Sequence, residues 1–192
     1  GTIRRDSFQY AKYSSRYDKF KEGIIENAFN PEFSNGALMD IGVYCVHPLV
    51  RLFGMPKKII ADSLLLSNGV EGAGTILASY DGMQAELLYS KITNNRLPSQ
   101  IQGEDGTLVI DNITNICSVV FHDRKGNAET VIELPPEHSL EGEVKDWLRM
   151  IATGEGVRED NECSLMELRV MDEARRQAGI VFPADLRKIT GC

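Results

Sequence analysis

Residues 36–54 are the part of the sequence that most constrains the fold. The segment begins and ends with glycine, and its interior is apolar except for four polar residues spaced three or four apart, Asp40, Tyr44, His47 and Arg51. On an α-helix these side chains fall at about 0°, 40°, 340° and 20°, within one arc of roughly 60°. The pattern predicts one helix, buried on most sides, whose narrow polar stripe lines a cavity.

A second interpretation of this segment stays open at this point. The helix could be an ordinary core helix whose polar groups meet water or pair with one another.

Pro48 has no N–H to donate to the carbonyl of Tyr44, and Gly42 adds flexibility, so we expect a kink at residues 44–48.

Length and charge limit what kind of protein this is. The chain has 192 residues, 42% of them hydrophobic and 26% charged, and a net charge of -7. This composition fits one soluble domain and makes nucleic acid an unlikely partner, because there is no basic patch. No apolar run is long enough for a membrane span and no signal peptide opens the chain. The four cysteines have no metal-ligand or disulfide spacing, so we predict reduced thiols in a cytoplasmic protein.

The rest of the chain predicts an α+β fold of two layers. A largely antiparallel, open-faced sheet of about seven strands is covered on one face by about three helices, and the bare face needs a partner. Asp81 and Gly82 indicate a type I′ hairpin turn. Ser164 and Glu167 form a capping box that predicts a helix start at residue 164. Residues 180–182 are a candidate edge strand before Pro183. The strands are predicted at residues 5–13, 58–66, 75–80, 84–91, 98–102, 107–111, 117–122 and 129–134. The strands after residue 57 are expected to form an antiparallel meander. The main helices are predicted at residues 36–54, 140–153 and 164–178.

Several kinds of site are excluded. The glycine-rich segment 69–74 joins two predicted strands, whereas a phosphate-binding loop opens a helix. His47, His122 and His138 are too far apart in the sequence to form a local metal site, and no nucleophile elbow occurs. No metal and no hydrolase chemistry is therefore expected.

The polar stripe remains as the candidate site. A tyrosine hydroxyl can donate a proton to a developing alkoxide if a nearby cation lowers its pKa from about 10. Arg51 is the only cation of the stripe, and a closer lysine from another part of the protein is not obvious in the sequence.

Several segments together resemble the second domain of the glucose-fructose oxidoreductase, inositol dehydrogenase and MocA family. The resemblance covers nearly the whole chain. It rests on residues 35–44 (NGALMDIGVY), 53–56 (FGMP), 80–82 (YDG), 101–108 (IQGEDGTL) and 171–183 (MDEARRQAGIVFP).

The resemblance implies a two-domain NAD(P)-dependent oxidoreductase. Its N-terminal Rossmann domain holds NAD or NADP, and its C-terminal domain supplies substrate contacts and the subunit interface. The family's dinucleotide fingerprint and Glu-Lys-Pro motif match nothing here, so we expect residues 1–192 to be the C-terminal domain alone, cut from a longer protein. We expect no cofactor in this fragment, and a homodimer or higher homo-oligomer through the open sheet face.

The resemblance also assigns roles to the stripe. Tyr44 stands where the sugar oxidoreductase and dihydrodiol dehydrogenase branches carry a catalytic tyrosine. His47 and Arg51 stand where the inositol dehydrogenase branch has an aspartate and a histidine, so that pair is not reproduced. We therefore expect Tyr44 to be the acid/base and Asp40, His47 and Arg51 to bind substrate, Asp40 at the pocket wall.

The resulting hypothesis is a domain of an oxidoreductase that acts on a sugar, polyol or related carbonyl or alcohol, inactive on its own. The alternative is a non-catalytic ligand-binding or assembly module with the same fold.

Overall fold

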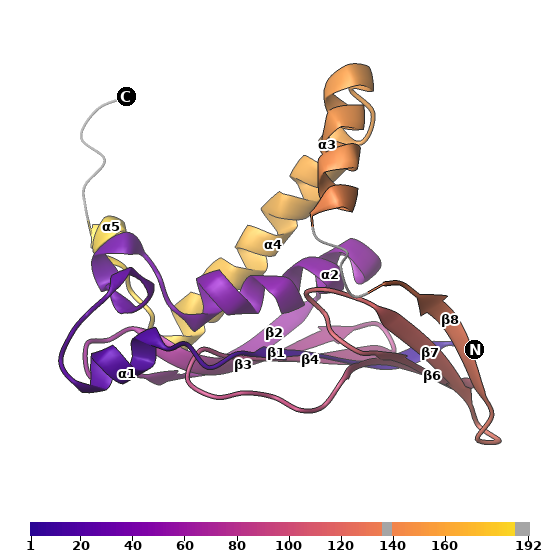
Figure 1. The fold of residues 1–192 in the computed structure, drawn as a ribbon, viewed down its shortest axis with the longest axis horizontal. Helices are drawn as coiled ribbons and strands as arrows, with labels where there is room; N and C mark the ends of the chain where they lie inside the picture. Colours follow the sequence, from indigo (N-terminus) through magenta and orange to yellow (C-terminus); the bar gives the residue numbers. More distant parts are fainter. Residues whose placement is uncertain (136–139, 187–192) are drawn as a thin grey trace.

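One eight-stranded sheet forms the body of the chain in a computed structural model, which describes residues 1–135 and 140–186 (Figure 1). The strands are β1 (Ile3–Ala11), β2 (Lys58–Leu65), β3 (Glu71–Tyr80), β4 (Met83–Ser90), β5 (Ser99–Gly103), β6 (Gly106–Ile110), β7 (Ser118–Asp123) and β8 (Ala128–Glu133). The α-helices are α1 (Arg16–Lys21), α2 (Val43–Phe53), α3 (Glu141–Thr153), α4 (Val157–Ala178) and α5 (Pro183–Leu186).

The strand order is β2-β3-β4-β1-β5-β6-β7-β8. Strand β1 lies parallel to β4 and antiparallel to β5, and every other neighbouring pair is antiparallel. The predicted open-faced, largely antiparallel α+β fold is thus confirmed. The meander expected for the strands after residue 57 is wrong at one point, because β1 from the start of the chain separates β4 from β5.

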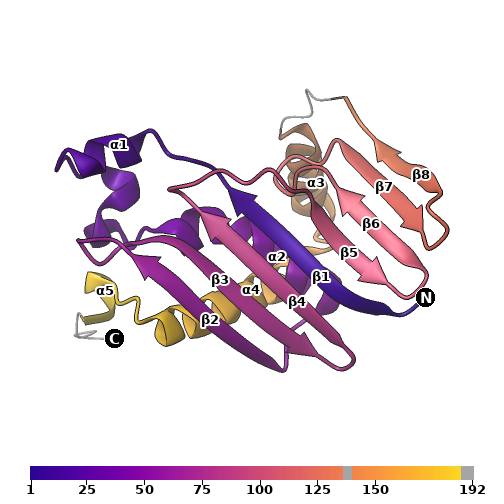
Figure 2. The same ribbon diagram turned by 90° about the horizontal axis from the view of Figure 1, so that it is seen from below.

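The main helices cover one face of the sheet. Figure 2 shows the bare face in front, with α2 and α4 behind strands β1 to β4. Alternate residues of these strands point toward the helices, and Phe8, Ile76 and Leu87 are fully buried there. Leu49 of α2 and Met171 of α4 pack into the same cluster. The periodicity of two in the strands therefore sets which face receives the helices.

The opposite face keeps apolar side chains in water. Ile60 of β2 and Leu77 of β3 are paired neighbours, and Leu88 of β4 lies on the same face. Each of the three is exposed by more than two fifths. A row of large apolar residues on a bare sheet face is typical of a surface made for association.

The predicted helix over residues 36–54 begins with a less regular turn. Residues Leu38–Gly42 form a π-helical turn, and α2 continues from Val43 to Phe53 with Pro48 inside it. The observed irregularity therefore lies before residue 43, on the N-terminal side of the predicted kink at residues 44–48, and that kink stays a prediction. π-Helical turns within helices are frequent at functional sites.

A buried carboxylate holds the start of this helix. Glu71 is fully buried and its Oε1 accepts a hydrogen bond of 2.8 Å from the backbone N–H of Leu38. Burial raises the pKa of Glu71, while the Leu38 bond opposes that change. Gly36 has a φ of +156°, and a Cβ there would overlap the Glu71 carboxylate. Gly36 is therefore required by the close approach of this cap.

We expect Gly36→Ala to lower the free energy of unfolding by about 2 kcal/mol or more, since it displaces a buried capping group. Gly69→Ala is the matched control, because Gly69 also has a positive φ but no neighbour within reach of a Cβ. In Gly69→Ala the free energy of unfolding should fall only by the cost of a positive φ at a non-glycine residue, about 1–2 kcal/mol. Equal losses in denaturant unfolding of the two variants would contradict this role of Glu71.

Three local predictions are wrong. Helix α4 begins at Val157, so Ser164 lies inside it and forms no cap. Residues 180–182 are not a strand but lead into α5 at Pro183. Gly82 has a positive φ but Asp81 does not, so the hairpin turn is not type I′.

Cys45, Cys117 and Cys163 are free thiols, two of them buried. Cys192 and His138 lie outside the described residues. Within residues 1–135 and 140–186, no helix has the length and apolar character to cross a membrane.

Candidate active site

The four polar residues of the stripe separate into two pairs. Asp40 and Tyr44 line a cavity beside the N-terminal end of α2. His47 and Arg51 do not line it and instead bind side chains of α4. The π-helical turn explains part of this separation, because residues 38–42 do not follow the 100° step assumed for an α-helix.

The cavity beside Tyr44 has a volume of about 350 Å³. It lies between the start of α2, the segment that follows β1, and the loop before α2. Its polar groups are hydroxyls, one carboxylate and cationic side chains, a combination suited to a hydroxyl-rich ligand. It is lined by Tyr10, Lys12, Tyr13, Ser14, Ser15, Arg16, Ala28, Asp40, Ile41, Tyr44 and Lys91.

The ring of Tyr44 packs against the ring of Tyr10, whereas its hydroxyl has no hydrogen-bond partner among the described residues. The ring meets that of Tyr10 edge to face, with centroids 5.5 Å apart and an interplanar angle of 77°. The side chain is about half exposed. Its hydroxyl makes no hydrogen bond to any residue the structure describes, so it can bind a ligand oxygen.

Asp40 is fixed by a buried lysine. Lys91 Nζ lies 2.7 Å from Asp40 Oδ2 and donates to the Ala28 carbonyl at 3.1 Å. The same ammonium lies over the ring of Phe29. The Lys91 side chain is only 3% exposed, whereas that of Asp40 is 54% exposed. An ammonium buried this deeply needs its partners, so Lys91 anchors the carboxylate at the cavity wall.

His47 and Arg51 connect α2 to α4. His47 Nδ1 lies 2.8 Å from Glu167 Oε2, and Arg51 Nη1 lies 3.0 Å from Asp160 Oδ1. The hydrogen bond to Glu167 raises the pKa of His47. Substrate binding by these two residues stays a prediction, and their observed contacts are structural.

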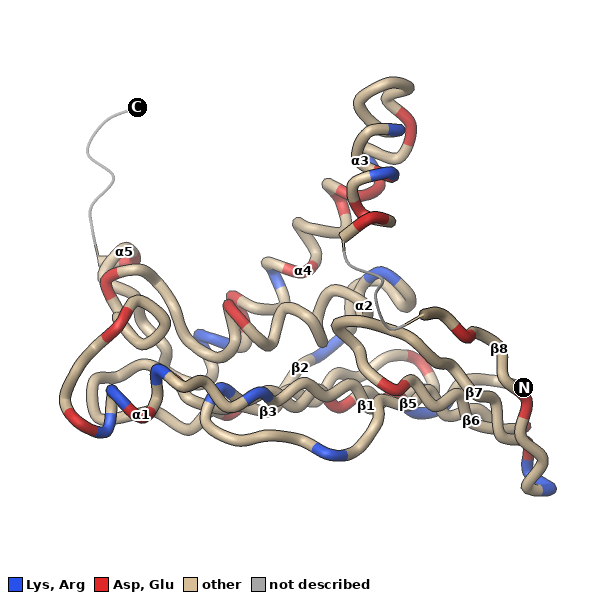
Figure 3. Tube along the Cα trace, in the orientation of Figure 1, with Lys and Arg blue, Asp and Glu red and all other residues tan. Residues whose placement is uncertain are grey.

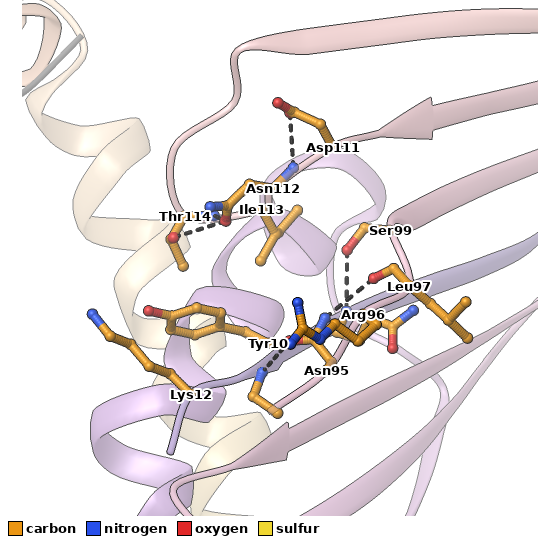
Figure 4. A pocket seen from close by; sticks show the side chains of 12 residues that line it. Tyr10, Lys12, Asn95, Arg96, Leu97, Ser99, Asp111, Asn112, Ile113 and Thr114 are labelled. Carbon is orange, nitrogen blue, oxygen red and sulfur yellow. Dashed lines mark hydrogen bonds between the residues drawn. The ribbon is translucent and has the colours of Figure 1, made fainter. Parts of the chain in front are cut away.

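A second cavity of about 490 Å³ adjoins the first, and Tyr10 and Lys12 line both (Figure 4). It adds amide, hydroxyl and cationic groups from the β4–β5 connection and from the turn after β6. Together the two cavities form a cleft with Tyr10 between its halves. The second is lined by Gln9, Tyr10, Ala11, Lys12, Asn95, Arg96, Leu97, Ser99, Asp111, Asn112, Ile113 and Thr114.

Neither a metal site nor a dinucleotide loop is found in the described part of the chain. No group of three or more His, Cys, Asp or Glu side chains there could hold a metal ion. The glycine-rich segment 69–74 ends the β2–β3 connection and forms the start of β3, so it opens no helix, which excludes it as a pyrophosphate cradle.

Two important residues were missed by reasoning from the sequence. Lys91 comes directly after the apolar strand β4 in the sequence. That position was the one signal from which its side chain could have been predicted to be buried. Tyr10 lies on β1, 34 positions before Tyr44, and the insertion of β1 into the sheet beside β4 brings its ring against that of Tyr44.

Residues 9–109 match the family model described as the GFO/IDH/MocA C-terminal domain. The chain belongs to the GFO/IDH/MocA family.

Relatives of this GFO/IDH/MocA chain include characterised and uncharacterised oxidoreductases. It is 47% identical over 187 residues to scyllo-inositol 2-dehydrogenase (NADP(+)) IolU of Bacillus subtilis (strain 168), covering 96% of this chain and 57% of that protein. It is 34% identical over 189 residues to the uncharacterized oxidoreductase YgjR of Escherichia coli (strain K12), covering 98% and 58%. The chain thus spans less than two thirds of the relatives it matches.

Solved structures show the same fold. The chain aligns with KijD10, a 3-ketoreductase from Actinomadura kijaniata in complex with TDP-benzene and NADP, with a TM-score of 0.72 and 20% identity. The alignment covers 93% of this chain and 53% of KijD10.

Proposed function

We propose that this chain is the substrate-binding domain of an NAD(P)-dependent oxidoreductase that acts on a sugar, polyol or related carbonyl compound. Tyr44 exchanges a proton with the substrate oxygen. A nucleotide-binding domain, absent from residues 1–192, holds the cofactor, and the fragment alone is inactive.

The free hydroxyl of Tyr44 in a polar cavity carries the proposal. Among the described residues, Asp40, His47 and Arg51 have charged partners, whereas the Tyr44 hydroxyl has no hydrogen-bond partner. Tyr44 also lines a cavity large enough for a small polyol. The family membership and the 47% identity to an inositol dehydrogenase support an oxidoreductase.

The residues of this chain supply binding and proton transfer. The nicotinamide ring, when bound, accepts or donates the hydride. On reduction the Tyr44 hydroxyl donates its proton to the substrate oxygen, and on oxidation the Tyr44 phenolate takes the alcohol proton and becomes the neutral phenol again. Asp40, fixed by Lys91, accepts a hydrogen bond from a neighbouring substrate hydroxyl.

An activity assay tests the function. The longer protein that contains this chain is incubated with NADP+ or NAD+ and a panel of polyols and sugars that includes scyllo-inositol. We expect cofactor reduction by the longer protein and none by residues 1–192. Absence of activity over the whole panel, in both directions, would favour the non-catalytic binding module. Turnover by residues 1–192 alone would contradict an incomplete site.

The bare sheet face is the proposed interface with a second copy. We expect residues 1–192 to form a dimer in light scattering, because Ile60, Leu64, Leu77 and Leu88 are exposed on that face. Leu77→Glu places a charge at its centre and should give a monomer with an unchanged fold. Lys125→Glu, in the β7–β8 turn, is the control and should leave the dimer intact. A monomeric wild-type chain would contradict this interface.

A further inference from the structure

Two buried charged residues contact the turn that carries Asp40, and each comes from the end of a neighbouring strand. Glu71 begins β3, and Lys91 directly follows β4. The backbone N–H of Lys91 donates to the Gly72 carbonyl at 2.8 Å, so the two side chains start from adjacent positions of the sheet. Both residues are buried. Because charged side chains are almost never fully buried unless they are paired, their contacts require an explanation.

The two residues hold different parts of the same turn. Glu71 Oε1 accepts a hydrogen bond of 2.8 Å from the backbone N–H of Leu38, the first residue of the π-helical turn. Lys91 Nζ lies 2.7 Å from Oδ2 of Asp40, in the middle of that turn. One contact therefore fixes the backbone of the turn, and the other fixes its acidic side chain.

The turn also packs tightly against the strand that leads to Lys91. A Cβ at Gly42, the last residue of the turn, would lie 3.2 Å from the ring of Tyr89 on β4. The Lys91 ammonium donates to the Ala28 carbonyl at 3.1 Å and lies over the Phe29 ring. Lys91 thus joins β4, the loop before α2 and the turn itself. Tertiary contacts, and not local helix geometry alone, set the position of the carboxylate on the turn.

The contact with Lys91 leaves one oxygen of Asp40 for a ligand. Among the described residues Oδ1 of Asp40 has no hydrogen-bond partner, and the side chain is 54% exposed where it lines the cavity. Positive and negative side chains are interspersed along the chain (Figure 3), so the adjacent Lys91, and not a cationic face, compensates the charge of Asp40. A carboxylate held in this way can accept a hydrogen bond from one hydroxyl at a defined place.

The two buried groups also stabilise each other. Burial raises the pKa of Glu71, whereas the hydrogen bond from Leu38 and the positive charges of Lys91 and Arg175 oppose that rise. Glu71 Oε2 has no hydrogen-bond partner in the described part of the chain. Removal of either Glu71 or Lys91 leaves the charge of the other less compensated, so we expect the two residues to act as one unit.

We propose that Lys91 and Glu71 are positioning residues of the reaction. They hold the π-helical turn so that Oδ1 of Asp40 meets the substrate hydroxyl next to the carbon that exchanges hydride, while Tyr44 meets the reacting oxygen. Lys91 acts through the Asp40 carboxylate, and Glu71 acts through the backbone of the turn. This inference rests on the proposed function, since it requires a substrate at Tyr44.

A double-mutant cycle in the longer protein tests the role of Lys91. Lys91→Met replaces the ammonium by an apolar group of similar length. It should raise the KM for the polyol about tenfold or more with a smaller change in kcat, because a hydrogen bond to a correctly held carboxylate is lost. In an Asp40→Asn background the same change should alter kcat/KM by less than about twofold, because the group that Lys91 positions is gone. Fully additive losses would overturn the proposal.

A substrate analogue gives a readout that a merely structural role would not move. A deoxy analogue without the hydroxyl next to the reacting carbon cannot bond to Asp40. The wild type should therefore prefer the polyol by at least about tenfold in kcat/KM, and Lys91→Met should lose most of this preference. Lys57→Met is the matched control, since Lys57 pairs with Asp81 away from the cavity, and it should keep the preference. An equal loss for both substrates in Lys91→Met would contradict positioning.

Two variants of Glu71 test the other contact and keep the proposal falsifiable if Lys91→Met does not fold. Glu71→Met removes the acceptor for the Leu38 N–H and should raise the KM for the polyol and weaken the preference over the deoxy analogue. Glu71→Gln keeps an acceptor oxygen and should recover most of that loss. Identical behaviour of the two variants would overturn the role of Glu71.

Hydrogen exchange at residues 38–42 separates this proposal from the proposed function, because it does not depend on turnover. In the longer protein Lys91→Met should speed exchange of these amides at least about tenfold relative to Lys57→Met. Faster exchange in a protein without dehydrogenase activity would refute the proposed function and leave the positioning contacts standing. An active protein with additive losses in the cycle and unchanged exchange would refute the positioning role alone.

Discussion

Tyr44→Phe should lower kcat of the longer protein by about 100-fold or more, with a much smaller change in KM. General acid–base catalysis by a positioned side chain contributes about 10²–10⁴-fold to a rate. The hydroxyl removed has no hydrogen bond within the described residues, so the variant loses proton transfer and little stability. The ring and its contact with Tyr10 are retained.

Tyr17→Phe is the matched control for this experiment. It makes the same chemical change at a tyrosine that packs against Phe20 and Phe29 and lines neither cavity of the cleft. Its rate should stay within about twofold of wild type. An equal loss in both variants, or no loss in Tyr44→Phe, would remove Tyr44 from the acid/base role.

A buried carboxyl on β1 should make stability depend strongly on pH. Asp6 is fully buried, and neither of its oxygens has a hydrogen-bond partner among the described residues. Burial raises the pKa of Asp6 from 3.8 to about 8; the neighbouring backbone N–H of Ser7 opposes this rise, and the negative charge of Glu86 adds a smaller one. The folded protein therefore keeps Asp6 protonated at a pH where the unfolded chain has lost that proton.

The direction of the effect follows from linkage. The folded state binds one more proton than the unfolded state between about pH 4 and pH 8, so the free energy of unfolding falls as the pH rises through this range. The slope from this one group is at most about 1.4 kcal/mol per pH unit. The contribution is fully present below pH 3.8, is lost progressively up to about pH 8, and is constant above that.

The Asp6→Asn variant isolates the contribution of the Asp6 carboxyl to the pH dependence of stability. Denaturant unfolding of both proteins at constant ionic strength should show that the wild type loses several kcal/mol more than Asp6→Asn between pH 5 and pH 8. The comparison cancels the contribution of His47, which both proteins share. Parallel stability curves would show that Asp6 is ionised in the folded protein and would contradict its burial without a partner.

Strong local patterns allowed much of the fold to be predicted. Alternation of apolar residues located the strands, and the spacing of the apolar residues located α3. What could not be predicted depends on pairing between distant segments. The insertion of β1 between β4 and β5 has no local signal. Strand β3 begins four residues earlier than predicted, at Glu71, a buried carboxylate whose partner is the backbone N–H of the distant Leu38.

The site was predicted only in part for the same reason. Of the polar stripe, Asp40 and Tyr44 line one cavity, and their roles in binding and catalysis stay predictions. An ideal helical projection also placed His47 and Arg51 beside them, but the π-helical turn shifts Asp40 and α4 engages the other two. Lys91 was missed because its partner lies 51 positions earlier in the chain.

We propose that Tyr44 meets the substrate oxygen at the edge of the cavity that it lines together with Asp40. The most direct measurement is a crystal structure of the longer protein with oxidised cofactor and the polyol it oxidises. We predict the Tyr44 hydroxyl within about 2.6–3.2 Å of the oxygen on the carbon that loses hydride, with Asp40 bonded to a neighbouring hydroxyl. A substrate bound at His47 and Arg51, with Tyr44 remote from the reacting carbon, would contradict the claim.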